Sequence, residues 1–236
     1  SLNKGIYSLI KKKLNDGRIV LYSGTACQVA GLKKYLQKDY ENLITVDILC
    51  HGVPTPKLWK KYLEEMQFLK KSRIKEIDLR NKETGWKEYS IKICFDNNEQ
   101  INEKFDENYY MKMFLGNLCL RPSCHDCQYK DIEHPSDITI GDYWGIEKQF
   151  PEMDDNKGIS IIKINTCKGK KIFAEISSKL VYKKVDIEVA LPPTAASRKS
   201  VVRHSNREKF FQQVDKKSME QLVKLTKTSK CRRKVR

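Results

Sequence analysis

The pattern of apolar and polar positions predicts two successive strand, turn and helix units early in the chain. Residues 17–22 form a short apolar run, and residues 29–38 carry apolar side chains at helical spacing. The same order returns with an apolar run at 43–49 and a one-sided helical pattern at 56–69. Successive units of this kind favour parallel strands with right-handed crossovers. We therefore expect a parallel sheet, in an α/β fold.

A different pattern follows. Residues 74–79 and 89–95 read as strands, the second with strict alternation, and a polar turn at 96–99 precedes a short strand that ends near Phe105. This order predicts an antiparallel hairpin inserted beside the parallel sheet.

The rest of the chain mixes both kinds of element. Further strands are expected at 138–140 and 159–164, and helices at 107–118, 168–179, 207–214 and 219–224. Because no repeat or low-complexity linker interrupts the chain, we expect a single domain over residues 1–236, with a basic tail at 224–236.

Composition and charge narrow the class of protein. The longest apolar run falls well short of the roughly 18 residues that span a bilayer, and residues 1–10 do not resemble a secretory signal, so we expect a cytoplasmic protein. The 46 basic and 30 acidic residues give a net charge of +16. The lysines are scattered and no known nucleic-acid module accompanies them, so a nucleic-acid partner is not expected.

Three of the eight cysteines, Cys119, Cys124 and Cys127, share one loop with C-x4-C-x2-C spacing. Plant-type ferredoxins use this spacing for three of the four ligands of an iron–sulfur cluster. Two alternatives stay open: three buried thiols without metal, or a zinc site completed by His125 or His134. Cys94, Cys167 and Cys231 lie outside this pattern and are not expected to be ligands.

Each predicted strand-to-helix turn also carries a cysteine. Cys27 and Cys50 should lie near each other, because the carboxyl ends of neighbouring parallel strands meet at one edge of a sheet. The turn with Cys27 could hold a phosphate or a thiolate, or merely cap the helix. The turn of Cys50, His51 and Gly52 could supply a ligand or a proton carrier, or be a simple turn.

A further segment, from Asp137 to Gly145, joins a strand to glycines, acidic residues and two aromatic residues. Planar side chains of this kind can form the floor of a pocket for a flat ring. An aromatic corner of the core would have the same composition.

Five ordered motifs resemble the family of coenzyme F420 hydrogenase or dehydrogenase β subunits, in their C-terminal domain, over about residues 18–215. The motifs are SGTACQVAGLKKYL, VDILCHGVPTP, LRNKETGW, CLRPSCHDCQYK and SDITIGDYWG. The resemblance implies an α/β fold and an iron–sulfur flavoprotein. Such a protein passes electrons between a carrier, which is deazaflavin F420, ferredoxin or similar, and a substrate that the resemblance does not identify.

The resemblance also implies roles for individual residues. A [4Fe-4S] cluster would be held by Cys119, Cys124, Cys127 and one of Cys27 or Cys50. Motif resemblance and local chemistry together suggest the FAD contacts, and no catalytic acid or base is assigned. The phosphates would meet Ser23, Gly24, Thr25 and Gln28, the charge partners would be Arg80, Lys82 and Lys130, and the ring would lie against Asp142, Tyr143, Trp144 and Gly145.

Two departures from the family pattern qualify these expectations. Ala26 replaces the proline usual before the first motif cysteine, and the ferredoxin-like cysteine runs common in the family are not in this sequence. We therefore expect electrons from a ferredoxin-like segment of a longer protein or from a separate carrier protein. The alternative function is a zinc-stabilised binding module that uses its basic surface for nucleic acid or an acidic partner.

Overall fold

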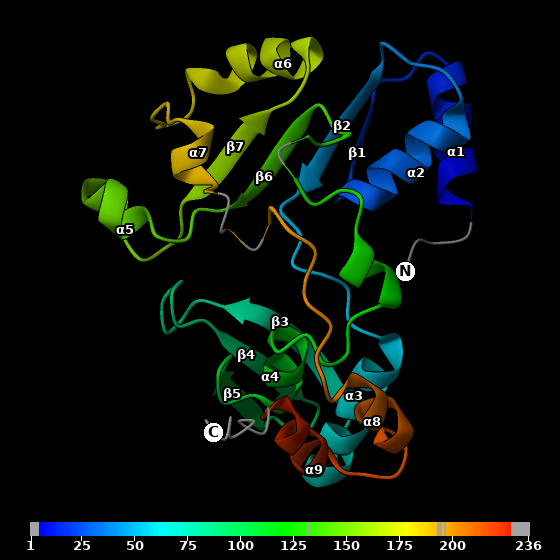
Figure 1. The fold of residues 1–236 in the computed structure, drawn as a ribbon, viewed down its shortest axis with the longest axis vertical. Helices are drawn as coiled ribbons and strands as arrows, with labels where there is room; N and C mark the ends of the chain where they lie inside the picture. Colours follow the sequence, from blue (N-terminus) through cyan, green and yellow to red (C-terminus); the bar gives the residue numbers. More distant parts are fainter. Residues whose placement is uncertain (1–4, 132, 193–194, 196, 228–236) are drawn as a thin grey trace, which may run out of the picture. The chain divides into compact units, whose positions relative to one another are not determined.

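The computed structural model describes residues 5–131, 133–192, 195 and 197–227, which gather into two compact units (Figure 1). Unit 1 comprises Ser1–His51, Cys127–Asp154 and Gly158–Ser200, and unit 2 comprises Gly52–Asp126, Asp155–Lys157 and Val201–Arg236. The expectation of a single domain stays a prediction. Residues 228–236, most of the predicted basic tail, lie outside the described residues.

Unit 1 is built on a four-stranded sheet in the order β1-β2-β6-β7. Strands β1 (Val20–Thr25), β2 (Leu43–Ile48) and β6 (Ile138–Asp142) are parallel, and β7 (Ser160–Ile164) is antiparallel to β6. The predicted α/β fold with parallel first strands is therefore confirmed, and the sheet as a whole is mixed.

Helices α1 (Ile6–Asn15) and α2 (Ala26–Leu36) form the first core of unit 1, together with β1. Their apolar side chains recur at helical spacing and are buried. This core contains Ile10, Leu14, Tyr22, Val29, Leu32, Leu36, Tyr40 and Leu43. The other helical elements of the unit are α5 (Ile146–Gln149), α6 (Cys167–Ser177), α7 (Ile187–Ala190) and the short 3-10 turn η2 (Pro151–Met153).

Unit 2 has its own antiparallel sheet of three strands, β3 (Ile74–Asn81), β4 (Ser90–Phe95) and β5 (Gln100–Lys104). The predicted strands and their antiparallel hairpin are thus present, and they belong to a separate three-stranded sheet. The helical elements of this unit are α3 (Pro56–Lys70), α4 (Tyr109–Leu115), α8 (Arg207–Gln213), α9 (Met219–Val223) and the 3-10 turns η1 (Pro122–Asp126) and η3 (Lys224–Thr226).

The helix after β2 also differs from expectation. Leu58, Tyr62 and Met66 of α3 are buried in the core of unit 2, together with Ile93 and Phe95 of β4. Helix α3 is therefore not a crossover on the parallel sheet. After β2 the chain leaves unit 1, and it returns only at Cys127, before β6.

Within the described ranges, no helix is long and apolar enough to cross a membrane.

Candidate site at the carboxyl edge of the parallel strands

The register of the parallel strands brings three predicted site residues to one edge. Thr25 of β1 pairs with Ile48 of β2, and Ile48 pairs with Ile140 of β6. Cys27, Cys50 and Asp142 each follow that row by two residues. The expectation that Cys27 and Cys50 share one sheet edge is therefore confirmed. In open α/β sheets, ligands bind outside this carboxyl edge.

Cys27 is held at this edge by the start of α2. Thr25 is the N-cap and forms a capping box with Gln28, whose Oε1 accepts a hydrogen bond of 2.9 Å from the Thr25 amide. The Thr25 hydroxyl lies 3.1 Å from the exposed Cys27 Sγ. The side chains of Thr25 and Gln28 therefore form the helix cap that was one of the alternatives for this turn.

Ser23 and Gly24 lie inside β1, which continues three residues beyond the predicted strand end. A Cβ atom at Gly24 would lie 2.9 Å from Gln28 Oε1. The glycine therefore leaves room for the side chain that completes the cap.

Lys130 contacts the same edge from the segment after the cysteine loop. Its ammonium group donates a hydrogen bond to the backbone carbonyl of Cys50. Three residues earlier, the Cys127 amide donates to Ser200 Oγ at 2.9 Å, and that hydroxyl donates back to the Cys127 carbonyl at 3.2 Å. Unit 1 therefore holds Cys27, Cys50, Cys127 and Lys130.

The end of β6 brings an aromatic pair to this region. Tyr143 is buried and its hydroxyl donates to Gln149 Oε1, and burial raises the pKa of Tyr143. Trp144 is 54% exposed, and Gly145 has φ of 91°, the left-handed conformation that starts α5. Tyr143 thus packs as a core residue, whereas the Trp144 ring is accessible.

Sequence reasoning missed a buried ionisable pair next to this edge. Asp47 of β2 lies 2.9 Å from His134 Nδ1, and their side chains are 0% and 4% exposed. No hydrogen-bond partner for Asp47 Oδ1 occurs among the described residues. The sequence signal was Asp47 itself, the second residue of the VDILCHGVPTP motif, whereas His134 was considered only as a zinc ligand.

Lys163 of β7 lies near this pair, because it faces Thr139 of β6, which in turn faces Asp47. Burial lowers the pKa of Lys163, and the negative charge of Asp47 opposes that shift. The Asp47 carboxylate therefore favours the charged form of Lys163 on this face of the sheet.

The SDITIG motif has a structural role at its start. Asp137 Oδ2 accepts hydrogen bonds from the Thr45 amide at 2.8 Å and the Thr45 hydroxyl at 2.7 Å. Asp137 Oδ1 accepts one from the Thr166 hydroxyl at 2.8 Å. These bonds join β2, β6 and the start of α6, and thereby fix the strands that carry the edge residues.

Four other predicted site residues belong to unit 2. Cys119 is fully buried in the core, and burial raises its pKa to about 12. Cys124 is half-buried, and its Sγ accepts a hydrogen bond of 3.3 Å from the Val53 amide. The Arg80 guanidinium lies 4.2 Å from the centre of the Tyr89 ring, and Lys82 Nζ donates to the Lys157 carbonyl at 2.9 Å.

Across the residues with described positions, no three histidine, cysteine or acidic side chains gather closely enough to hold a metal ion. The donors are chemically suited to iron, since they are thiols, and the Val53 amide already donates to the sulfur of Cys124. The cluster ligands stay predictions.

The histidines considered for zinc are engaged in separate units. His125 Nδ1 lies 3.0 Å from the Val201 carbonyl in unit 2, and His134 contacts Asp47 in unit 1. Of the cysteines not expected to bind metal, Cys94 is half-buried in β4, Cys167 is exposed at the start of α6, and Cys231 lies outside the described residues.

Comparison with known proteins gives one family. The model of the carboxyl terminus of the coenzyme F420 hydrogenase/dehydrogenase beta subunit matches residues 17–189. The resemblance inferred from the motifs covers the same region and extends further, to about residue 215. No curated protein matches the sequence.

Proposed function

Because the chain belongs to the family formed by the carboxyl-terminal part of coenzyme F420 hydrogenase/dehydrogenase β subunits, we propose that it is an iron–sulfur flavoprotein oxidoreductase domain. It would pass electrons between a carrier, which is F420, ferredoxin or similar, and a substrate not yet identified. The family points to oxidoreductase chemistry. The observation that carries the finer proposal is the convergence of Cys27, Cys50 and Asp142 at one sheet edge.

The proposed cofactors divide the chemistry between them. When bound, FAD exchanges hydride or single electrons and a [4Fe-4S] cluster exchanges single electrons. The protein contributes the ligands, the orientation and the local charge. The electron partner is proposed to be a ferredoxin-like segment or a separate carrier protein.

We propose Cys27, Cys50 and Cys127 as cluster ligands in unit 1. Cys124 is added on sequence spacing, because it precedes Cys127 by three residues. Cys119 differs from these four, since its side chain is fully buried in the apolar core of unit 2. In this proposal Cys119 is a core residue.

For FAD, the accessible Trp144 ring is the best candidate to contact the flavin, with Asp142 and Gly145 flanking it. Lys130 supplies positive charge at the same edge, where it is held by the Cys50 carbonyl. The side chains of Thr25 and Gln28 are engaged in the α2 cap, so a phosphate at this turn would meet the backbone rather than these side chains.

The Asp47 and His134 pair is the proposed proton-handling group. Asp47 accepts from or donates to Nδ1 and thereby fixes the orientation of the imidazole, which leaves Nε2 to exchange a proton.

The test is visible absorption and iron content of anaerobically purified protein. We expect a broad brown absorption with flavin peaks and bound iron. Cys50→Ser and Cys127→Ser should lose most of the iron, whereas the matched controls Cys94→Ser and Cys167→Ser should keep it. A colourless protein with one equivalent of zinc would instead support the zinc-stabilised binding module.

A further inference from the structure

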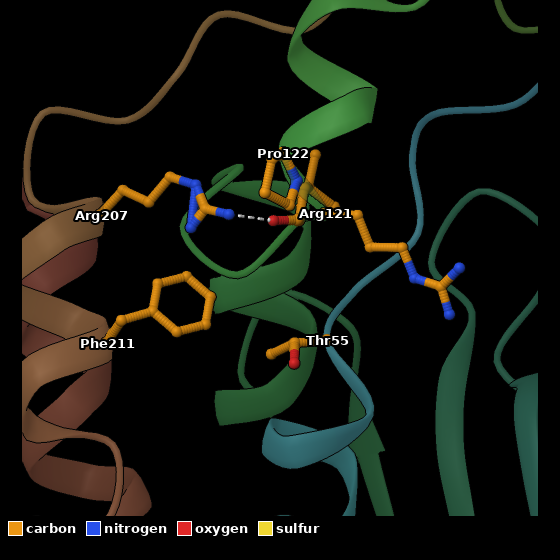
Figure 2. A pocket seen from close by; sticks show the side chains of 6 residues that line it. Thr55, Arg121, Pro122, Arg207 and Phe211 are labelled. Atoms are coloured by element: carbon orange, nitrogen blue, oxygen red, sulfur yellow. Dashed lines mark hydrogen bonds between the residues drawn. The ribbon is translucent and has the colours of Figure 1, made fainter.

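Unit 2 contains a cavity that the proposed function does not use. Its volume is about 310 Å³, and its lining residues are Thr55, Leu120, Arg121, Pro122, Arg207 and Phe211 (Figure 2). Figure 2 shows Arg207 and Phe211 on one helix, α8, facing Thr55 and Pro122, whereas the guanidinium of Arg121 extends away to the other side. Arg207 is therefore the cation of this cavity.

The Arg207 guanidinium is held in place but is not saturated with partners. One Nη atom donates to the Leu120 carbonyl at 2.7 Å, and the group stacks 4.4 Å from the centre of the Phe211 ring. A guanidinium has five N–H donors. Among the described residues, Arg207 donates only this one hydrogen bond, so N–H donors remain for a ligand. The stacking on Phe211 fixes the guanidinium before a ligand binds.

The charge around this group is uncompensated. Burial lowers the pKa of Arg207, and the positive charge of Arg203 lowers it further. In the ranges with assigned positions, no carboxylate forms an ion pair with Arg121, Arg203 or Arg207. An anion in the cavity would relieve this repulsion.

The remaining lining adds one polar group and several apolar ones. Thr55 is the N-cap of α3, yet its hydroxyl makes no capping hydrogen bond. Leu120, Pro122 and Phe211 provide apolar walls. Ligand pockets of this composition bind an apolar body and fix it through a few polar contacts.

We propose that this cavity binds a small aromatic anion, with its phosphate or carboxylate on Arg207 and Thr55 and its ring against Phe211 and Pro122. Phosphate and carboxylate share the chemistry that an arginine fork recognises. At about 310 Å³ the cavity lies at the lower end of the pocket sizes that hold small molecules, which suits a ligand with a single ring.

The test is titration of the full chain, followed by calorimetry, with phenyl phosphate, benzoate, inorganic phosphate and uncharged benzyl alcohol. We expect phenyl phosphate or benzoate to bind at least about tenfold more tightly than benzyl alcohol. Tighter phenyl phosphate assigns a phosphate ligand, and tighter benzoate assigns a carboxylate ligand. Equal binding of benzyl alcohol, or no binding of either anion at millimolar concentration, would overturn the proposal.

Variants locate the binding. Arg207→Gln should weaken the better anion by about tenfold or more, whereas Lys209→Gln, a control at an exposed position of the same helix, should change affinity less than about threefold. Since Arg207→Gln also removes the bond to the Leu120 carbonyl, Thr55→Val serves as a second probe that leaves α8 intact. Unchanged affinity in both Arg207→Gln and Thr55→Val would refute this site. The readout needs neither iron nor flavin, so it is independent of the oxidoreductase proposal.

Discussion

Asp137 is a buried carboxylate that the fold keeps charged. Burial alone would raise its pKa, but hydrogen bonds from Thr45 and Thr166 outweigh burial and lower it below the ordinary value of 3.8. A carboxyl group with a lowered pKa in the folded state stabilises the protein above its unfolded-state pKa. That contribution is lost as the pH falls through the folded-state pKa.

Asp137→Asn should therefore destabilise the protein in a pH-dependent way. Both carboxylate oxygens of Asp137 accept hydrogen bonds, whereas an asparagine side chain has only one oxygen. We therefore expect the free energy of unfolding to fall by about 1–3 kcal/mol at pH 7. The difference from the unsubstituted protein should shrink as the pH falls below about 4. Urea unfolding at several pH values measures this, with Asp39→Asn at an exposed position as control. A difference that stays constant with pH would contradict the argument.

Cys119 should be the least reactive thiol of the cysteine loop. It is 0% exposed, and its raised pKa keeps it as a thiol at neutral pH. Alkylation of metal-free protein, followed by mass spectrometry, should label exposed Cys27 and Cys167 quickly and Cys119 only on unfolding. Cys119→Ala should also retain iron after anaerobic reconstitution. Loss of iron in that variant would return Cys119 to the ligand set.

Among the site residues, the sequence predicted those positions that depend only on which strands are neighbours. Cys27 and Cys50 could be placed at one edge because each follows a strand of the same parallel pair. The Thr45 and Asp137 bonds join residues 92 positions apart, and the Asp47 and His134 pair joins residues 87 apart. No local pattern encodes such pairings, so these buried polar contacts could not be predicted.

Elements were predictable where the hydrophobic period is long or clear. Strand β4 alternates over six residues, and α2 repeats its apolar face over three turns. Helices α5 and α7 have only four residues each, too few to show a period. The sequence showed that α3 has an apolar face and is therefore buried on one side. It did not show against which of the two sheets that face packs.

The start of α2 gives a prediction at the scale of one element. Gln28→Ala removes the acceptor of the Thr25 amide, so we expect a loss of about 0.5–1.5 kcal/mol. Hydrogen exchange should quicken in the first turn of α2, beside Cys27, and less elsewhere. Gln28→Glu, which keeps an oxygen acceptor, should restore protection. Equal exchange in all three proteins would show that the cap does not hold this turn.

For the whole molecule, the core of unit 2 depends on a late segment of the chain. Phe210, Val214, Met219 and Leu222 are buried with residues of β4 and α4, although they lie beyond the family match, which ends at residue 189. The limits of a family model are therefore not the limits of a folded unit here. The sequence predicted α8 and α9, but not which core they complete.

A chain that ends at residue 200 should lose the fold of unit 2. The four buried side chains contribute about 1.5–3 kcal/mol each, a sum comparable to the stability of a typical domain. Hydrogen exchange should lose protection in β4 of the shortened chain and keep it in β2, relative to the full chain. Retained protection in β4 would show that α8 and α9 are dispensable for this core.

The interleaved path of the chain has a consequence for its synthesis. Strand β2 leaves the ribosome long before β6, its parallel neighbour, whose first paired residue is Ile138. The core of unit 2 is completed still later, when Met219 and Leu222 have left the ribosome. During that interval one side of β2 has no native partner, and the core that α3 and β4 share lacks the side chains of α8 and α9 that complete it. Exposed strand edges and apolar faces promote aggregation. We therefore expect chaperones to bind the nascent chain between the emergence of β2 and that of Leu222.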